Sequence, residues 1–192
     1  MGMNEAVERD MRKSMAYVDA IQPVVQKLLG GEFMPVEGEE NPVCQMLDRT
    51  CGTDYFQVYR QRRLVWGVAS RVQEIWDGCK PFNTFTVRKA RASGVKTEYE
   101  KRKDAIRSGG VYPYLTLQAY VNDKTGALMS LAVVRTEDLM KYVESGKAKE
   151  KHTGEKQVGQ AAFFTVDWQG FHDAGYRILT YPDNSIIRTQ TA

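Results

Sequence analysis

The sequence predicts a mixed α/β or α+β fold in which a mixed β-sheet is flanked by helices. Between residues 112 and 121 apolar side chains alternate with polar ones, as in a strand with one buried face. Residues 98–107 follow a capping-box sequence and precede two glycines, as in a helix. Strand and helix patterns of this kind recur along 192 residues, of which 42% are hydrophobic, so the chain can bury a core.

The first 53 residues are predicted to form a helical arm followed by a linker. Apolar residues recur at helical spacing over residues 5–29, and Pro23 is expected to kink or split this helix. Residues 32–53 are rich in Gly, Pro and Glu. This composition favours an acidic linker, or a loop that covers a site. We therefore expect a helical arm at 1–31, the acidic segment at 32–53 and a core domain at 54–192.

The core domain is predicted to begin with a β-hairpin and to alternate strands with helices from there on. A helix between residues 98 and 107 is long enough to make the strands at 82–87 and 112–121 parallel neighbours. Thr136 is expected to cap the next helix, which continues to about Glu144. The expected strands are 55–59, 64–73, 82–87, 112–121, 128–134, 161–168 and 177–181, with a charged loop at 147–156 and a short helix or turn at 171–174.

Composition limits the environment of the protein. Its 27 Lys and Arg against 24 Asp and Glu leave a formal charge of +3, so only local clustering can attract nucleic acid or anionic membranes. No apolar run approaches membrane-spanning length and the N-terminal residues do not resemble a secretory signal, which predicts a cytoplasmic protein with no membrane partner. Three cysteines, Cys44, Cys51 and Cys79, do not form a disulfide framework or a zinc-ligand pattern.

The hairpin carries residues that bear on chemistry. Asp54 precedes its first strand, and the second strand contains the sequence Gly67-Val68-Ala69-Ser70-Arg71-Val72-Gln73. This stretch, with Leu47-Asp48 before it, resembles the core of the PD-(D/E)XK nuclease-like superfamily. In that family an Asp at the start of one strand, and an acid followed two residues later by Lys on the next strand, surround one or two Mg²⁺ ions.

The resemblance implies that Asp54 is the metal candidate and that Ala69 and Arg71 stand where the acid and the Lys belong. Ala69 cannot bind a metal, and no Asp or Glu in the chain is followed two residues later by Lys. Arg71 and Gln118 are therefore expected to line the site beside Asp54. The implied cofactor is none, or Mg²⁺ if an acid or amide from elsewhere completes the site, the candidates being Gln73, Glu74, Glu98 and Gln118.

Basic residues cluster between positions 88 and 107, where they outnumber Glu98, Glu100 and Asp104. Such clusters neutralise phosphates, although most charge runs are only solvated surface. Aromatic residues are interleaved through the same region, and Tyr114 and Tyr120 share a strand face with polar groups. The candidate phosphate contacts are Arg88, Lys89, Arg91, Lys96, Lys101, Arg102 and Lys103, with Arg60, Arg62 and Arg63 as a possible extension.

These observations predict a nucleic-acid-binding protein, with DNA ahead of RNA, whose nuclease-like core is inactive, as in many phage or mobile-element proteins. One alternative is a protein-interaction module, an inhibitor or assembly factor, that docks on a partner or on a second copy of itself through its N-terminal helix. A second alternative is a Mg²⁺-dependent nuclease whose acidic residue comes from outside the motif.

Overall fold

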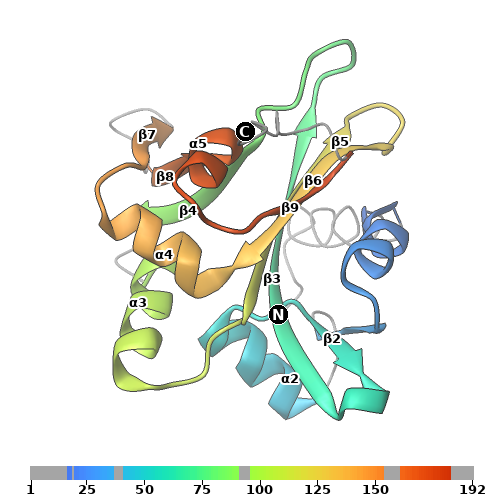
Figure 1. Cartoon of the computed structure of the whole chain (residues 1–192), viewed down its shortest axis with the longest axis vertical. Coiled ribbons are helices and arrows are strands. Elements are labelled where there is room, and N and C mark those ends of the chain that lie inside the picture. The colour runs from blue at the N-terminus through green and yellow to red at the C-terminus, as the bar shows by residue number, and fades with distance from the viewer. Residues whose placement is uncertain (1–16, 19, 37–40, 91–95, 154–160, 183–192) are drawn as a thin grey trace, which may run out of the picture.

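The protein has an α+β fold built from two β-sheets and the helices that pack against them, as a computed structural model shows (Figure 1). The structure describes residues 17–18, 20–36, 41–90, 96–153 and 161–182. The expected fold class is confirmed, since the larger sheet is mixed and helices flank it. Among the described helices, none combines the length and the hydrophobicity required to span a lipid bilayer.

Among the described residues, the larger sheet has six strands, and one pair of them is parallel. Strand β3 (Leu64–Ile75) runs parallel to β5 (Leu115–Asn122), and all other pairs are antiparallel. The expected hairpin of β2 (Tyr55–Tyr59) and β3 is confirmed, with η2 (Arg60–Arg62) as its turn. The order is β1 (Glu32–Pro35), β2, β3, β5, β6 (Leu128–Arg135) and β9 (Leu179–Tyr181).

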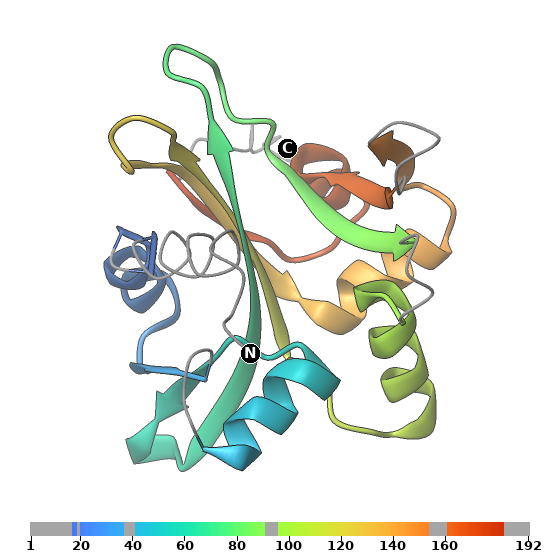
Figure 2. The ribbon, with the colours of Figure 1, turned by 180° about the vertical axis from the view of Figure 1, so that it is seen from behind.

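The smaller sheet has the order β4, β8, β7, and it corrects the predicted topology. Strand β4 (Thr84–Ala90) was expected beside β5 in one sheet, but it pairs with β8 (Ala161–Asp167), which pairs in turn with β7 (Lys149–Thr153). Both edges of β5 are already occupied by β3 and β6, so β4 cannot join that ladder. Strand β7 lies where a charged loop was expected. Strand β4 lies apart from β3 in both views of the ribbon (Figure 1 and Figure 2).

The helices of the core follow the sequence closely. Helix α3 (Glu98–Ser108) begins with the expected capping box between Thr97 and Glu100, and it ends at Gly109, which has a left-handed φ of 67°. Helix α4 (Thr136–Glu144) occupies the expected residues, but Thr136 is not its cap. The Thr136 side chain is buried, and its hydroxyl lies 2.9 Å from that of Thr116 on β5. Helix α5 (Trp168–Asp173) directly follows β8.

The N-terminal segment contributes to the core. Residues 20–29 are helical throughout, so Pro23 does not split this helix, because the fixed φ of proline is compatible with helical backbone. Ile21 and Val25 are buried against the larger sheet. Residues 32–53, expected as an acidic linker or loop, hold β1, α2 (Pro42–Met46) and η1 (Leu47–Cys51). Residues 1–16, which include Val7 and Met11 of the predicted apolar stripe, lie outside the described structure.

The two faces of the larger sheet are buried by different partners. One face packs against residues 20–29, and the other packs against the smaller sheet, α4 and α5. The alternation predicted for β5 is confirmed, because Leu117 and Ala119 lie in the first core and Tyr120 in the second. The polar residues of β5 therefore point toward the smaller sheet, where the functional side chains gather.

Candidate functional site

The site lies where the free edge of β4 meets the face of β5. The backbone N–H and the hydroxyl of Thr86 both donate to Oε1 of Gln118, at 3.3 and 3.1 Å. Gln118 Nε2 donates in turn to Oε1 of Gln73 on β3, at 3.1 Å. The hydroxyl of Tyr120 accepts from the N–H of Thr84, at 3.3 Å. Side chains from β5 thus satisfy amides of β4 that pair with no strand in the described part of the chain, which protects this edge of the smaller sheet.

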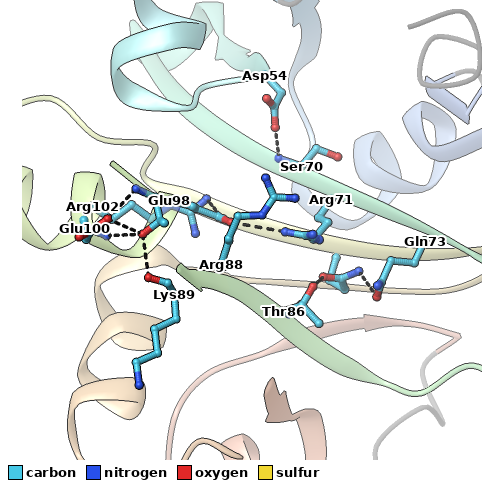
Figure 3. A network of polar contacts seen from close by, with 12 residues as sticks. Asp54, Ser70, Arg71, Gln73, Thr86, Arg88, Lys89, Glu98, Glu100 and Arg102 are labelled. Carbon is cyan, nitrogen blue, oxygen red and sulfur yellow. Dashed lines mark hydrogen bonds and ion pairs between the residues drawn. The ribbon is translucent and has the colours of Figure 1, made fainter. Parts of the chain in front are cut away.

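Three arginines surround Glu98 next to this edge, and we call these four residues the arginine cluster (Figure 3). Arg102 Nη2 lies 2.6 Å from Oε1 of Glu98, and Arg71 Nη1 lies 3.6 Å from its Oε2. The backbone N–H of Arg88 donates to the same Oε2 at 3.4 Å. Arg71 comes from β3, Arg88 from β4 and Arg102 from α3, so tertiary contacts create this cluster.

The arginine cluster has more positive than negative charge. Its described contacts bring together three guanidinium groups and one carboxylate. Burial lowers the pKa of Arg71; Glu98 opposes this effect, whereas Arg88 and Arg102 lower the pKa further. Arg102 is only 3% exposed, and its Nε and Nη1, like the Nε of Arg88, have no hydrogen-bond partner among the described residues. The cluster therefore combines cationic repulsion with unused donors, and an added anion would relieve both.

Arg88 also belongs to a row of side chains that crosses the smaller sheet. Strand pairing sets Lys151 of β7 opposite Phe163 of β8, and Phe163 opposite Arg88 of β4. Residues directly opposite each other point to the same side of a sheet, so these three side chains share one face. The guanidinium carbons of Arg71 and Arg88 lie 5.0 and 5.4 Å from the centroid of the Phe163 ring, which brings Arg71 to the same surface. We call Arg71, Arg88, Phe163 and Lys151 the basic row.

Lys149 extends the basic row by one position. It is exposed on β7 and lies opposite Thr165, which in turn lies opposite Thr86 of β4. Lysines on alternate positions of one strand share a face, so Lys149 and Lys151 present their ammonium groups on the same side as Arg88. The result is a partly exposed surface of cations around an aromatic ring.

The structure separates the basic residues that the sequence grouped together. Arg88 belongs to the basic row, whereas Lys89, one position along β4, lies on the other side of the smaller sheet, with its Nζ 2.5 Å from Glu150. Lys96 pairs with Asp104 at 2.7 Å and Lys103 with Glu144 at 3.5 Å. These pairs reduce the excess of positive charge that the sequence indicates on α3.

The remaining candidates differ in position. Arg102, expected to contact phosphate, is buried within the arginine cluster, where it pairs with Glu98 one helical turn before it. Burial raises the pKa of the Cys51 thiol, and Lys101 lies close enough to oppose part of that effect. Arg91 lies outside the described residues, and Arg60, at the far hairpin turn, pairs with Glu32 at 2.8 Å.

The expected metal site is not assembled in the way that the nuclease resemblance implies. One carboxylate oxygen of Asp54 accepts a hydrogen bond from the backbone N–H of Ser70 (Figure 3). This bond continues the contact between β2 and β3 at the residue before the start of β2. Ala69, at the position of the acid, has no ligand atom in its side chain, and Arg71, at the position of the Lys, adds a positive charge that would repel a divalent metal. Within the described part of the chain, no group of three or more His, Cys, Asp or Glu side chains is placed to hold a metal ion. These residues do not fit a Mg²⁺ site, and we assign no catalytic step to a metal.

The other residues expected near the metal site lie on different faces of the larger sheet or in ion pairs. Arg71 and Gln118 lie opposite each other on the parallel strands β3 and β5. Glu74 lies on the other face of β3, where the hydroxyl of Tyr17 donates to it. Glu98 does reach Arg71, but it is engaged by arginines. Phe163 and the lysines of β7 were not predicted from the sequence, although the alternation in residues 161–167 indicates the face on which Phe163 lies.

No protein-family model, curated protein or solved structure matches this chain. The fold and the site define an α+β protein with a cationic, aromatic surface between its two sheets. Function is therefore argued from the chemistry of that surface.

Proposed function

We propose that this protein binds nucleic acid through the basic row, as a binding protein whose nuclease-like core carries out no cleavage. The phosphate groups are held by Arg71, Arg88 and Lys151, with Lys149 beside them. One observation carries the proposal: strand register and ring stacking align cations from β3, β4 and β7 around Phe163. Phosphodiester backbones need such a line of cations, and guanidinium groups bind phosphate oxygens with two donors at once.

The arginine cluster supports the same ligand. Desolvation of an arginine is costly unless an anion compensates for it. Glu98 pairs with the guanidinium groups of Arg71 and Arg102, whereas its described contact with Arg88 is to the backbone N–H. A phosphate bound between Arg71 and Arg88 supplies the second negative charge. The alternative of docking through the N-terminal helix has less support, because Ile21 and Val25 of its apolar stripe are already covered by the chain's own sheet.

The test measures fluorescence anisotropy of labelled single-stranded DNA, duplex DNA and RNA between about 50 and 200 mM salt, a range over which four phosphate contacts to a single strand change affinity roughly 50-fold. The double variant Lys149→Ala, Lys151→Ala should weaken binding and reduce the slope of log affinity against log salt by about 1.4 for single strands, about 0.7 for each contact. Arg88→Ala should reduce it by about 0.7 more. A denaturing gel of the same samples, run with Mg²⁺ present, should show intact oligonucleotide.

The matched control removes two exposed cations elsewhere. Lys141→Ala, Lys147→Ala changes the formal charge by the same amount on α4 and the turn after it, and should leave the salt slope within error of the unmodified protein. Equal effects of the two double variants would mean that only net charge matters, and would refute the basic row as the binding surface. Cleavage of the oligonucleotide that Asp54→Ala abolishes would show that the protein is a nuclease.

A further inference from the structure

The segment that connects β3 to β4 carries two exposed aromatic rings. Trp76 is 78% exposed and Phe82 is 67% exposed. Figures 1 and 2 show that this segment projects beyond the end of β3, next to the turn between β5 and β6. A single exposed apolar residue is common on protein surfaces, so its exposure alone does not indicate a role. Two further observations indicate a role for these rings: hydrogen bonds hold the segment in place, and Phe82 lies beside the basic row.

The projecting segment is braced at both ends. The backbone N–H of Asp77 donates to the side chain of Asp123 at 2.9 Å, and the side-chain amide of Asn122 donates to Asp77 at 2.9 Å. At the other end, the N–H of Trp168 donates to the carbonyl of Asn83 at 3.0 Å. These bonds hold the segment in place before any ligand arrives, which reduces the ordering cost of binding.

Phe82 is also continuous with the basic row. The Nζ of Lys151 lies 5.8 Å from the centroid of the Phe82 ring, and Lys151 lies opposite Phe163 in the sheet. The Phe82 ring rests edge-to-face on buried Tyr120, at a centroid distance of 6.2 Å. Two guanidinium groups stack on Phe163, whereas most of the surface of Phe82 is open to solvent. A proposed phosphate contact and an exposed, supported ring therefore lie side by side.

We infer that the ligand is a single-stranded nucleic acid, whose bases stack on Phe82 and Trp76 while its phosphates follow the basic row. This inference rests on the proposed function and specifies its substrate class. Cationic grooves lined by aromatic rings bind single strands because every base has an open face to stack. In a duplex these faces are covered by neighbouring bases, so a duplex can use the cations but not the rings.

The experiment compares three ligands of matched length, about 20 nucleotides each: single-stranded oligo-dT, a duplex, and an abasic single strand that keeps the phosphates but lacks the bases. Phe82→Ala and Trp76→Ala should each weaken oligo-dT binding by roughly 5- to 100-fold, the range for loss of one stacked base. Binding of the abasic strand, and the salt slope, should stay unchanged, because no cation is removed. Trp76→Phe should restore most of the oligo-dT affinity.

Met46→Ala is the control, since it removes an exposed apolar side chain of α2, 54% exposed, and should leave all three affinities unchanged. Equal losses for oligo-dT and the abasic strand, or no loss for either, would overturn base stacking. If Lys149→Ala, Lys151→Ala still weakened binding in that case, the basic row would stand and the rings would serve another partner. If the unmodified protein bound none of the three ligands, the proposed function and the stacking inference would both be wrong.

Discussion

Replacement of Glu98 by Gln removes the carboxylate that holds the arginine cluster and keeps the shape of the side chain. Arg102 then loses its charged partner at 2.6 Å while it stays buried at 3% exposure. Arg71 loses the partner at 3.6 Å that opposes the lowering of its pKa by burial. The substitution should therefore lower the free energy of unfolding, even though it removes no apolar contact.

The magnitude follows from the burial of Arg102. Removal of one partner from a buried ion pair costs about 3–5 kcal/mol, and the amide oxygen of the introduced glutamine still accepts one hydrogen bond, so we expect about 3 kcal/mol. Glu137 is the matched control because it also lies in the first turn of its helix and also pairs four residues on, but with exposed Lys141. Glu137→Gln should cost about 1 kcal/mol, the sum of its surface pairs with Lys141 and Arg135 and its interaction with the helix dipole.

Differential scanning calorimetry measures the difference. At about 2–4 °C for each kcal/mol in a chain of this size, Glu98→Gln should lower Tm by about 6–12 °C and Glu137→Gln by about 2–4 °C. Glu98→Gln should at the same time strengthen nucleic-acid binding, because a negative charge beside the basic row is lost. Equal Tm changes in the two variants would refute the view that Glu98 compensates buried arginine charge.

Two further predictions concern the core and pH. The Phe85 side chain is 1% exposed, and its ring centroid lies 5.8 Å from that of Trp168. In urea unfolding, Phe85→Ala should lower the free energy of unfolding by about 3–5 kcal/mol, and Phe82→Ala, at an exposed ring, by less than about 1 kcal/mol. Similar losses in the two variants would contradict the assigned core. Hydrogen bonds from the backbone N–H of Thr97, and then from its hydroxyl, lower the pKa of Glu100 below its ordinary value of 4.5. The ionised carboxylate therefore stabilises the fold at pH values above 4.5. This stabilisation is lost as the pH falls through the pKa that Glu100 has in the folded protein. The stability advantage over Glu100→Gln should therefore shrink as the pH is lowered from about 6 to about 3, and a constant difference would refute this linkage.

Local patterns predicted most of the elements. The capping box of Thr97 and Glu100, the alternation of β5 and the apolar run of β6 each act through neighbours in the chain, and each is confirmed. The sheet topology was predicted less well. Which strands become neighbours depends on the path of the segment between β3 and β4, which carries β4 out of the larger sheet, and that path has no local signature.

The candidate site was predicted in part. Arg71, Gln118 and Arg88 were identified and do lie near one another, because strand positions fix which way they point. Phe163 and Lys151 were missed, since they come from strands far along the chain from Arg88 and meet it only through pairing. The charge of α3 was overestimated, because Glu144 and Glu150 are close to its lysines and to Lys89 in space but not in sequence.

The sequence by itself determined the class of fold, the alternating faces of β5 and the presence of a basic segment, because propensity, capping and periodicity act over a few residues. Tertiary structure decided which charges from distant segments are paired. Glu98 gathers arginines from three elements, while acids from α4 and β7 neutralise lysines that the sequence had grouped with them. The interaction energy of two charges depends on the distance between them in space. For residues far apart in the sequence, that distance is set only when the sheets and helices pack together.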